Sequence, residues 1–358
     1  MLLNESMKPT VLIQQQQLPN YRIPLFNILS RRVNLTVLHS SDPPLETTEF
    51  KQIIRPLHKF GPFLHQHYYD LLSNYDVLIT EANLRFLLCN IFHAFFPRRY
   101  KWIPWGIGVS ASYSRHFGQK RPFEFLRFFL YRQSDALIFY SNKVLPTYIS
   151  HGFRGESLFV ANNTVFVPTV DSFPLQNKNT FLFVGSLHPS KRILDLITSF
   201  FQYVKHVESP LKFHIVGTGP DYDKAVLHTQ HLGIESLVVF HGSIYDEERL
   251  ASLFRNALFC ISPFQAGLSV LKSFGYGAPF IAHSNSITGG ELYNIKNDYN
   301  GYLLNSLDIV YKYFLDADQN PSKYVQMGIN ARYTYIKDAN PESFVATFVD
   351  AIDYVMAN

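Results

Sequence analysis

The sequence predicts an α/β protein built from two domains, each with a parallel sheet. Short aliphatic or β-branched runs alternate with longer segments of helical apolar spacing along the whole chain, which is typical of parallel strands covered by helices. A length of 358 residues suits two domains of ordinary size. Residues 162–180 are rich in Asn, Pro, Ser, Thr and Gln and lack a helical pattern, which indicates a linker between two such domains.

The strand candidates fall into two series on either side of this linker. Those of the first series are residues 10–14, 35–39, 77–80, 100–104, 136–140 and 157–160. Those of the second series are residues 180–184, 212–216, 238–241, 258–262 and 280–282. With the boundary near Asp171, we predict domains over residues 1–170 and 171–340. Residues 341–358 form an amphipathic helix that we expect to pack back toward the N-terminal domain.

Composition excludes several classes of protein. An apolar fraction of 47% with 17% charged residues predicts a folded chain, and the mild net charge of +4 without a dense Lys/Arg block argues against nucleic-acid binding. The two cysteines lie in apolar runs, which indicates reduced thiols and a cytoplasmic setting, and no segment has the pattern of a signal peptide or a membrane span. The histidines match none of the usual zinc spacings, so no metal or other cofactor is expected.

Glycine follows three successive strand candidates of the second domain, at Gly185, Gly217 with Gly219, and Gly242. Carboxyl ends of parallel strands meet at one edge of the sheet, where ligands of open α/β sheets bind. Any one of these glycines is explained by an ordinary strand-to-helix turn. Three together favour bare backbone around a nucleotide diphosphate.

A strand, a loop of small residues and a helix follow one another over residues 258–277 of the second domain. The loop includes Gln265, Ala266, Gly267 and Leu268, and the helix ends at Gly277, ahead of Pro279. Free N–H groups at a helix N-terminus favour phosphate or sugar hydroxyls. The pattern therefore predicts an anion site that adjoins the three glycine turns.

From Thr180 to Gly301 these motifs resemble, in order, the C-terminal domain of glycosyltransferase family 4, retaining enzymes of the GT-B fold that use nucleotide-diphosphate sugars. The resemblance implies two Rossmann-like domains facing a central cleft, with the donor in the C-terminal one. It places Lys191 at the donor diphosphate. The catalytic residues that we infer are Lys191, Gly267 and Lys272. The donor-binding residues that we infer are Gly185, Ser186, Gly217, Gly219, Gly242, Ser243, Gln265, Ala266, Leu268 and Glu291.

The sequence departs from the family pattern at three positions. Ser186 replaces the usual arginine after Gly185, and Phe264 and Lys272 stand where the family has an acidic pair. Lys272 has two explanations: it faces the donor and replaces the cation lost at Ser186, or it extends from the helix to water. Lys191 could likewise be a solvated residue at a helix start, but a cation there opposes the helix dipole unless it meets an anion.

Polar and aromatic residues at strand ends of the first domain suit an acceptor. Tyr21 and Arg22 lie in a segment that resembles the family's first loop, and Trp105 with Gly106 ends a strand. Glu81, Asn83 and Arg85 follow another strand and suit acceptor hydroxyls, although helix capping explains Asn83 equally well. The acceptor-binding residues that we infer are Tyr21, Arg22, Glu81, Asn83, Arg85, Trp105 and Gly106.

Aromatic residues and arginines alternate over residues 121–132, after a similar group at residues 95–100. This composition suits a helix lying on an anionic membrane, which would make the protein peripheral on the inner face of that membrane. A helix packed in the core or between domains, with a solvated arginine edge, is the alternative.

The resemblance implies a retaining transfer of sugar from a nucleotide-diphosphate donor to a polysaccharide or lipid-linked glycan of the capsule, O-antigen or exopolysaccharide type. The missing acidic pair and Ser186 motivate a second hypothesis, a catalytically silent GT-B subunit that acts as a binding or scaffold partner. An epimerase acting on nucleotide sugars is disfavoured, because no carboxylate pair stands at the expected strand ends.

Overall fold

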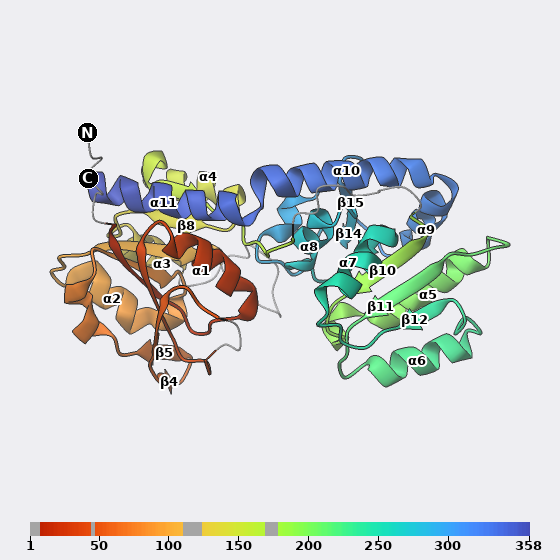
Figure 1. The fold of residues 1–358 in the computed structure, drawn as a ribbon, viewed down its shortest axis with the longest axis horizontal. Helices are drawn as coiled ribbons and strands as arrows, with labels where there is room; N and C mark the ends of the chain where they lie inside the picture. Colours follow the sequence, from red (N-terminus) through yellow and green to blue (C-terminus); the bar gives the residue numbers. More distant parts are fainter. Residues whose placement is uncertain (1–7, 44–46, 110–123, 169–177) are drawn as a thin grey trace. The chain divides into compact units, whose positions relative to one another are not determined.

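The structure is a computed structural model that describes residues 8–43, 47–109, 124–168 and 178–358. The chain forms two compact units (Figure 1). The first unit takes residues up to Phe166, apart from 111–117, together with Pro341–Asn358, and the second takes the remainder. Each unit contains one parallel sheet with helices, which confirms the predicted fold class. The predicted boundary at Asp171 lies outside the described residues.

The first unit is built on a seven-stranded parallel sheet with the order β3-β2-β1-β6-β7-β8-β9. Strand β1 lies in the interior of the sheet between β2 and β6 and has four consecutive buried residues, as expected where helices cover both faces. The bounds are β1 (Thr10–Gln14), β2 (Asn34–His39), β3 (Lys51–Ile54), β6 (Val77–Glu81), β7 (Lys101–Gly106), β8 (Leu137–Phe139) and β9 (Leu158–Val160). An antiparallel hairpin is formed by β4 (Leu57–Phe60) and β5 (Phe63–Gln66).

The first unit contains short helices between its strands and the longer C-terminal helix α11. The α-helices are α1 (Ile23–Ser30), α2 (Leu87–Phe95), α3 (Glu124–Tyr131), α4 (Leu145–Ser150) and α11 (Pro341–Ala357). The 3₁₀ helices are η1 (Asn20–Arg22), η2 (Tyr69–Asn74), η3 (Leu84–Phe86), η4 (Asn142–Val144) and η5 (Gly155–Ser157).

The second unit has a six-stranded parallel sheet with the order β12-β11-β10-β13-β14-β15. Its strands are β10 (Thr180–Val184), β11 (Lys212–Val216), β12 (Val238–Phe240), β13 (Ala257–Ile261), β14 (Phe280–His283) and β15 (Gly301–Leu304). Its helices are η6 (Pro189–Lys191), α5 (Ile193–Val204), α6 (Tyr222–His231), α7 (Glu247–Asn256), α8 (Ser269–Gly275), η7 (Glu291–Asn294), α9 (Val310–Gln319) and α10 (Pro321–Asp338). Helix α5 buries apolar residues at helical spacing, which attaches it to the sheet.

All eleven predicted strands are present, but the sequence analysis missed β3, β15 and the β4–β5 hairpin. Strand β3 lies at the sheet edge with no fully buried residue, so it lacks the apolar run by which the others were recognised. The hairpin carries His58 and His65 on paired strands. Within the described residues, no helix is both long and apolar enough to cross a lipid bilayer.

The C-terminal helix α11 belongs to the first unit, where it lies beside α1 (Figure 1). Its inner face buries Phe344, Phe348, Ile352 and Val355. Phe348 is fully buried with its ring centroid 4.9 Å from that of Trp105, in an edge-to-face arrangement. The last residues of the chain thus complete a core that begins with β1.

We expect Phe348→Ala to destabilise the protein by about 3–5 kcal/mol, because it removes a buried aromatic ring and leaves a cavity beside Trp105. Urea unfolding followed by tryptophan fluorescence measures the loss. Asp350→Ala, at an exposed position of the same helix, is the control and should change stability by no more than about 0.5 kcal/mol. A similar small loss for both variants would contradict this account of α11.

Candidate functional site

The turns that follow β10 and β11 pack backbone against backbone at the carboxyl edge of the second sheet. The N–H of Gly185 donates to Val216 at 3.0 Å, and the N–H of Leu187 donates to Thr218 at 2.8 Å. A Cβ on Gly217 would lie 1.9 Å from the carbonyl oxygen of Gly185, and one on Gly219 would lie 2.6 Å from that of Leu187. These two glycines are therefore required for contact between the turns, a reason that the sequence analysis did not identify.

The remaining turn residues border the same edge. Gly242 has a φ of 66°, which favours glycine, and its carbonyl accepts from the N–H of Gly217 at 2.8 Å. Ser243 and Thr218 share a hydrogen bond between their hydroxyls at 3.0 Å. The side chain of Ser186 is exposed. The inferred residues at 185, 186, 217, 219, 242 and 243 thus form one continuous surface.

Lys191 lies at this edge with its ammonium group largely buried. The residue is 7% exposed, and its Nζ donates to the carbonyl oxygen of Gln265 at 3.4 Å. Desolvation lowers the pKa of Lys191 to about 8. None of the ion pairs in the described part of the chain involves this lysine. A buried cation without a carboxylate partner is costly and suits an anionic ligand.

Arg192, which the sequence analysis did not select, shapes this region. It has a φ of 51° and a ψ of 47°, a left-handed conformation that is unfavourable for a residue with a side chain. Its guanidinium lies 4.2 Å from the ring centroid of Phe264 and its Nε donates to Asp195 at 2.5 Å. Arg192 therefore joins the turn that carries Lys191 to the loop after β13.

The loop of residues 262–268 holds four of the inferred residues. The carbonyl oxygen of Gln265 accepts from the Ser262 hydroxyl at 2.9 Å as well as from Lys191, and Ala266 is fully buried. A Cβ built on Gly267 would meet no atom within 4 Å. Leu268 is the N-cap residue that precedes α8, and its side chain makes no capping hydrogen bond. Open space beside Gly267 is compatible with a ligand at this position.

Lys272 has a partner that its sequence neighbourhood did not reveal. Its Nζ lies 2.8 Å from the Glu247 carboxylate at the start of α7, and the Tyr276 hydroxyl donates to the other oxygen of that carboxylate. The lysine side chain is 24% exposed, so it does not simply extend to water. Glu247 neutralises the charge of Lys272. Lys272 is therefore a poor substitute for the cation lost at Ser186. A contact between Lys272 and a donor stays a prediction.

Glu291 is buried and engaged within its own turn. Its carboxylate accepts from the N–H of Gly289 at 2.8 Å and from the Thr288 hydroxyl at 3.1 Å. The Thr288 hydroxyl in turn accepts from the N–H groups of Gly290 and Leu292. These bonds give Glu291 a structural role at the start of η7.

Arg22 is the centre of a polar cluster at the carboxyl edge of the first sheet. Its guanidinium donates to the side chains of Gln15 and, at 2.7 Å, Tyr140, and it lies 4.4 Å from the ring centroid of Trp105. Arg22 is 9% exposed and Gln15 is fully buried, yet the Nε of Arg22 and the Nε2 of Gln15 have no hydrogen-bond partner in the described residues. Tyr21 precedes this cluster and its ring lies 5.7 Å from the guanidinium.

Glu81 lies at the end of β6, at this same edge. One carboxylate oxygen accepts from the N–H of Gln16 at 3.1 Å. Burial raises the pKa of Glu81, and the Gln16 hydrogen bond and the charge of Arg22 oppose that shift. Asn83 accepts from the N–H of Arg85 at 3.0 Å, and the Arg85 guanidinium donates to the carbonyl of Pro62. The capping explanation of Asn83 is therefore the one that the structure shows.

Trp105 and Gly106 do not have the surroundings predicted for acceptor binding. Trp105 is 2% exposed and packs against Phe26 and Phe348 in the core of the first unit. Gly106 is closely packed, because a Cβ there would lie 3.2 Å from that of Ala82 and would require a shift of a few tenths of an ångström. The sequence analysis overlooked that α11, more than 200 residues later, would cover this strand end.

An exposed aromatic patch on α2 and α3 covers part of the segment predicted to lie on a membrane; residues 121–123 fall outside the described residues. The patch comprises Phe95, Phe96, Phe125 and Phe129, each more than half exposed. The rings of Phe95 and Phe129 lie 5.6 Å apart. Arg127 departs from the prediction, because it is buried and pairs with Glu124 at 3.1 Å.

Comparison with known proteins finds a family model that matches part of the second unit. Residues 178–312 match the family model described as glycosyl transferases group 1. The chain is 27% identical over 178 residues to a lipopolysaccharide 1,6-galactosyltransferase of Salmonella typhimurium. The matched segment covers 48% of this chain and 48% of that protein. It is 29% identical over 141 residues to an alpha-monoglucosyldiacylglycerol synthase of Streptococcus pneumoniae, 36% of this chain and 32% of the relative. The chain thus matches about half of the first relative and about a third of the second.

The crystal structure of Anabaena Alr3699/HepE in complex with UDP is similar to this structure, with a TM-score of 0.71 and 14% sequence identity. The similarity covers 96% of this chain and 99% of that one. At this low sequence identity the similarity supports the predicted fold and carries no conclusion about activity. The chain thus has the GT-B fold, and its residues 178–312 match the glycosyl transferases group 1 model.

Proposed function

We propose that this protein transfers a hexose, with retention of configuration, from a uridine-diphosphate sugar to a lipid-linked or lipopolysaccharide-type glycan. The observation that carries the proposal is the buried Lys191, a cation that has no carboxylate partner among the described residues, within the segment that matches the glycosyl transferases group 1 model. The choice of UDP and of a hexose follows the similar proteins, one in complex with UDP and two named for galactosyl or glucosyl transfer to lipid-bearing molecules. Capsule, O-antigen and exopolysaccharide glycans are the corresponding acceptor types.

The donor is held by the second unit. Lys191 meets the diphosphate together with the bare backbone around Gly185 and Gly267. The Glu247 carboxylate, 41% exposed and held by Lys272, accepts hydrogen bonds from the ribose hydroxyls, as acidic residues do in other nucleotide-binding folds. On this proposal Lys272 acts through Glu247.

The acceptor is held by the first unit. Tyr21 and Glu81 are partly exposed at this edge, where the Tyr21 hydroxyl can donate to or accept from acceptor hydroxyls and the Glu81 carboxylate can accept from them. These groups occupy the end of the sheet where ligands of open α/β folds bind.

In the transfer step the bond from C1 of the sugar to the diphosphate breaks, and C1 forms a bond to the acceptor hydroxyl oxygen on the same face. The hydroxyl proton passes to the departing phosphate oxygen, so no protein base is required. Negative charge grows on the diphosphate as it leaves, and the fixed ammonium of Lys191 stabilises that charge.

We expect purified protein to convert a UDP-hexose to UDP in the presence of a lipopolysaccharide-core or diacylglycerol-glycoside acceptor. UDP release, measured for UDP-glucose and UDP-galactose with and without acceptor, tests this. Lys191→Ala should lower transfer strongly, because it removes the charge nearest the leaving group. UDP binding without turnover on any of these acceptors would instead favour the catalytically silent subunit.

We expect the affinity for UDP to fall as the pH rises above about 8. A bound diphosphate favours the charged form of Lys191 and raises its pKa, so affinity stays level below the pKa of the free protein, about 8, and declines above it. Calorimetry between about pH 7 and 10 measures this. Lys191→Met should weaken binding at pH 7 by about 1.5–3 kcal/mol and remove the decline. Lys205→Met, at an exposed lysine directly after α5, is the control; a parent-like pH profile in Lys191→Met would contradict the assignment.

We further propose that the aromatic patch of Phe95, Phe96, Phe125 and Phe129 rests on an anionic membrane surface. Three exposed phenylalanines on two adjacent helices and Phe96 directly after α2 form an apolar surface, and exposed Arg99 and Arg132 lie on the segments that follow α2 and α3. Such a position would bring the first unit to a lipid-linked acceptor.

We expect the protein to sediment with vesicles that contain phosphatidylglycerol and to be released as salt rises. The double variant Phe125→Asp/Phe129→Asp should lose this binding, because it places carboxylates in the apolar surface. Tyr333→Asp, an exposed aromatic position of the second unit, is the matched control. Equal recovery with neutral and anionic vesicles, or unchanged binding of the double variant, would exclude the patch.

A further inference from the structure

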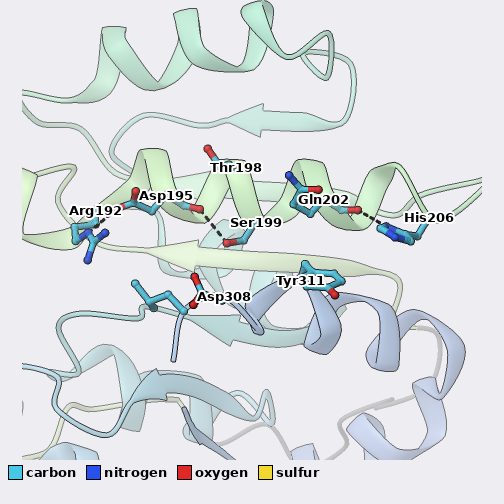
Figure 2. Close-up of a pocket in the computed structure, with 9 residues that line it drawn as sticks. Arg192, Asp195, Thr198, Ser199, Gln202, His206, Asp308 and Tyr311 are labelled. Atoms are coloured by element: carbon cyan, nitrogen blue, oxygen red, sulfur yellow. Dashed lines mark hydrogen bonds and ion pairs between the residues drawn. The ribbon is translucent and has the colours of Figure 1, made fainter. Parts of the chain in front are cut away.

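A polar groove lies on the second unit between α5 and the start of α9 (Figure 2). Its volume is about 500 Å³, within the range of pockets for small ligands. It runs along one side of α5, beginning at Arg192, and contains none of the residues inferred above for donor or acceptor. The lining residues are Arg192, Asp195, Thr198, Ser199, Gln202, His206, Leu307, Asp308 and Tyr311.

One wall is a row of polar side chains on α5. Asp195, Ser199 and Gln202 follow one another at spacings of four and three residues, so they occupy the same side of the helix, and His206 continues the row from the turn that follows α5. The Ser199 hydroxyl donates to the backbone carbonyl of Asp195 at 3.0 Å, and the Nδ1 of His206 lies 2.7 Å from the carbonyl of Gln202. These contacts restrain the side chains of Ser199 and His206.

The opposite wall carries Asp308 and Tyr311 (Figure 2). The Tyr311 ring lies nearly parallel to that of His206, with an interplanar angle of 25° and centroids 5.9 Å apart. One oxygen of Asp308 accepts from the Ser306 hydroxyl at 3.1 Å, and the carboxylate is otherwise exposed. Within the described residues, the Gln202 amide and the Tyr311 hydroxyl make no hydrogen bond, so both are available to a ligand.

The charges of the groove select a class of ligand. Two carboxylates stand against one guanidinium, and that guanidinium already pairs with Asp195 at 2.5 Å, so a phosphate or another anion is disfavoured. Leu307 is the one aliphatic side chain among the lining residues, which disfavours a lipid chain. A neutral saccharide has paired hydroxyls for carboxylate and amide groups and an apolar ring face for a tyrosine.

We propose that this groove is a second saccharide-binding site, in which Asp308, Gln202 and Tyr311 hold a neutral segment of glycan outside the transfer site. Asp308 accepts from a pair of sugar hydroxyls, Gln202 both donates and accepts, and Tyr311 packs against a sugar ring. This site requires neither a nucleotide nor catalytic turnover.

The test is saturation-transfer NMR with the neutral oligosaccharides maltohexaose and stachyose, recorded with excess UDP present. We expect at least one of them to bind, and Tyr311→Ala to weaken that binding about fivefold or more. Asp308→Asn, at an exposed position where folding is not at risk, should weaken it in the same direction. Tyr333→Ala, an exposed tyrosine on α10, is the matched control and should bind like the parent.

Three outcomes would overturn the proposal. Neither oligosaccharide binds, or Tyr311→Ala and Asp308→Asn both bind as the parent does, or inorganic pyrophosphate displaces the oligosaccharide in the presence of UDP. Calorimetric affinity for UDP is measured in parallel on all variants and should be unchanged. A loss of UDP affinity would assign the effect to the donor site and count against a separate groove.

Discussion

Burial of the Lys191 ammonium is the constraint around which the edge of the second sheet is arranged. An ammonium removed from water without a charged partner is costly, and among the described residues its hydrogen bond is a long one, to a backbone carbonyl at 3.4 Å. Its turn also contains a left-handed arginine, which costs roughly a further 1–2 kcal/mol. Two local costs at adjacent positions are typical of a functional site, where the surrounding structure maintains a strained arrangement. The contact of Arg192 with Phe264 helps to maintain it.

The charges of this site are redistributed relative to the family that it resembles. At the first position of the family's acidic pair, Phe264 lies under the Arg192 guanidinium. At the second position Lys272 holds a carboxylate that arrives from α7. A negative group is thus still present near α8, but Glu247 supplies it. On this view the loss of the acidic pair from positions 264 and 272 does not by itself imply a silent protein.

The sequence predicted the fold well because strand position in a parallel sheet depends on local apolar runs, such as Phe181 to Phe183, which are fully buried. The position of the glycines at the strand ends was also predicted. Two of them are explained by contact between backbones, and a role in donor binding stays a prediction. What local patterns could not predict were contacts between distant segments. Lys272 and Glu247 are 25 residues apart, and the burial of Trp105 depends on α11 at the other end of the chain. The left-handed conformation of Arg192 could not be predicted from the sequence either, because arginine has no preference for that region.

The burial of Trp105 links the C-terminal helix to the polar cluster of the first unit. Phe348 packs on one side of the indole, and the Arg22 guanidinium lies 4.4 Å from its ring centroid. The same guanidinium donates to Tyr140, whose ring meets Trp105 edge to face at 5.7 Å. The orientation of Arg22 therefore depends on an indole that α11 holds in place. In this way a residue misassigned to acceptor binding still contributes to the candidate acceptor edge, through packing and not through contact with a ligand.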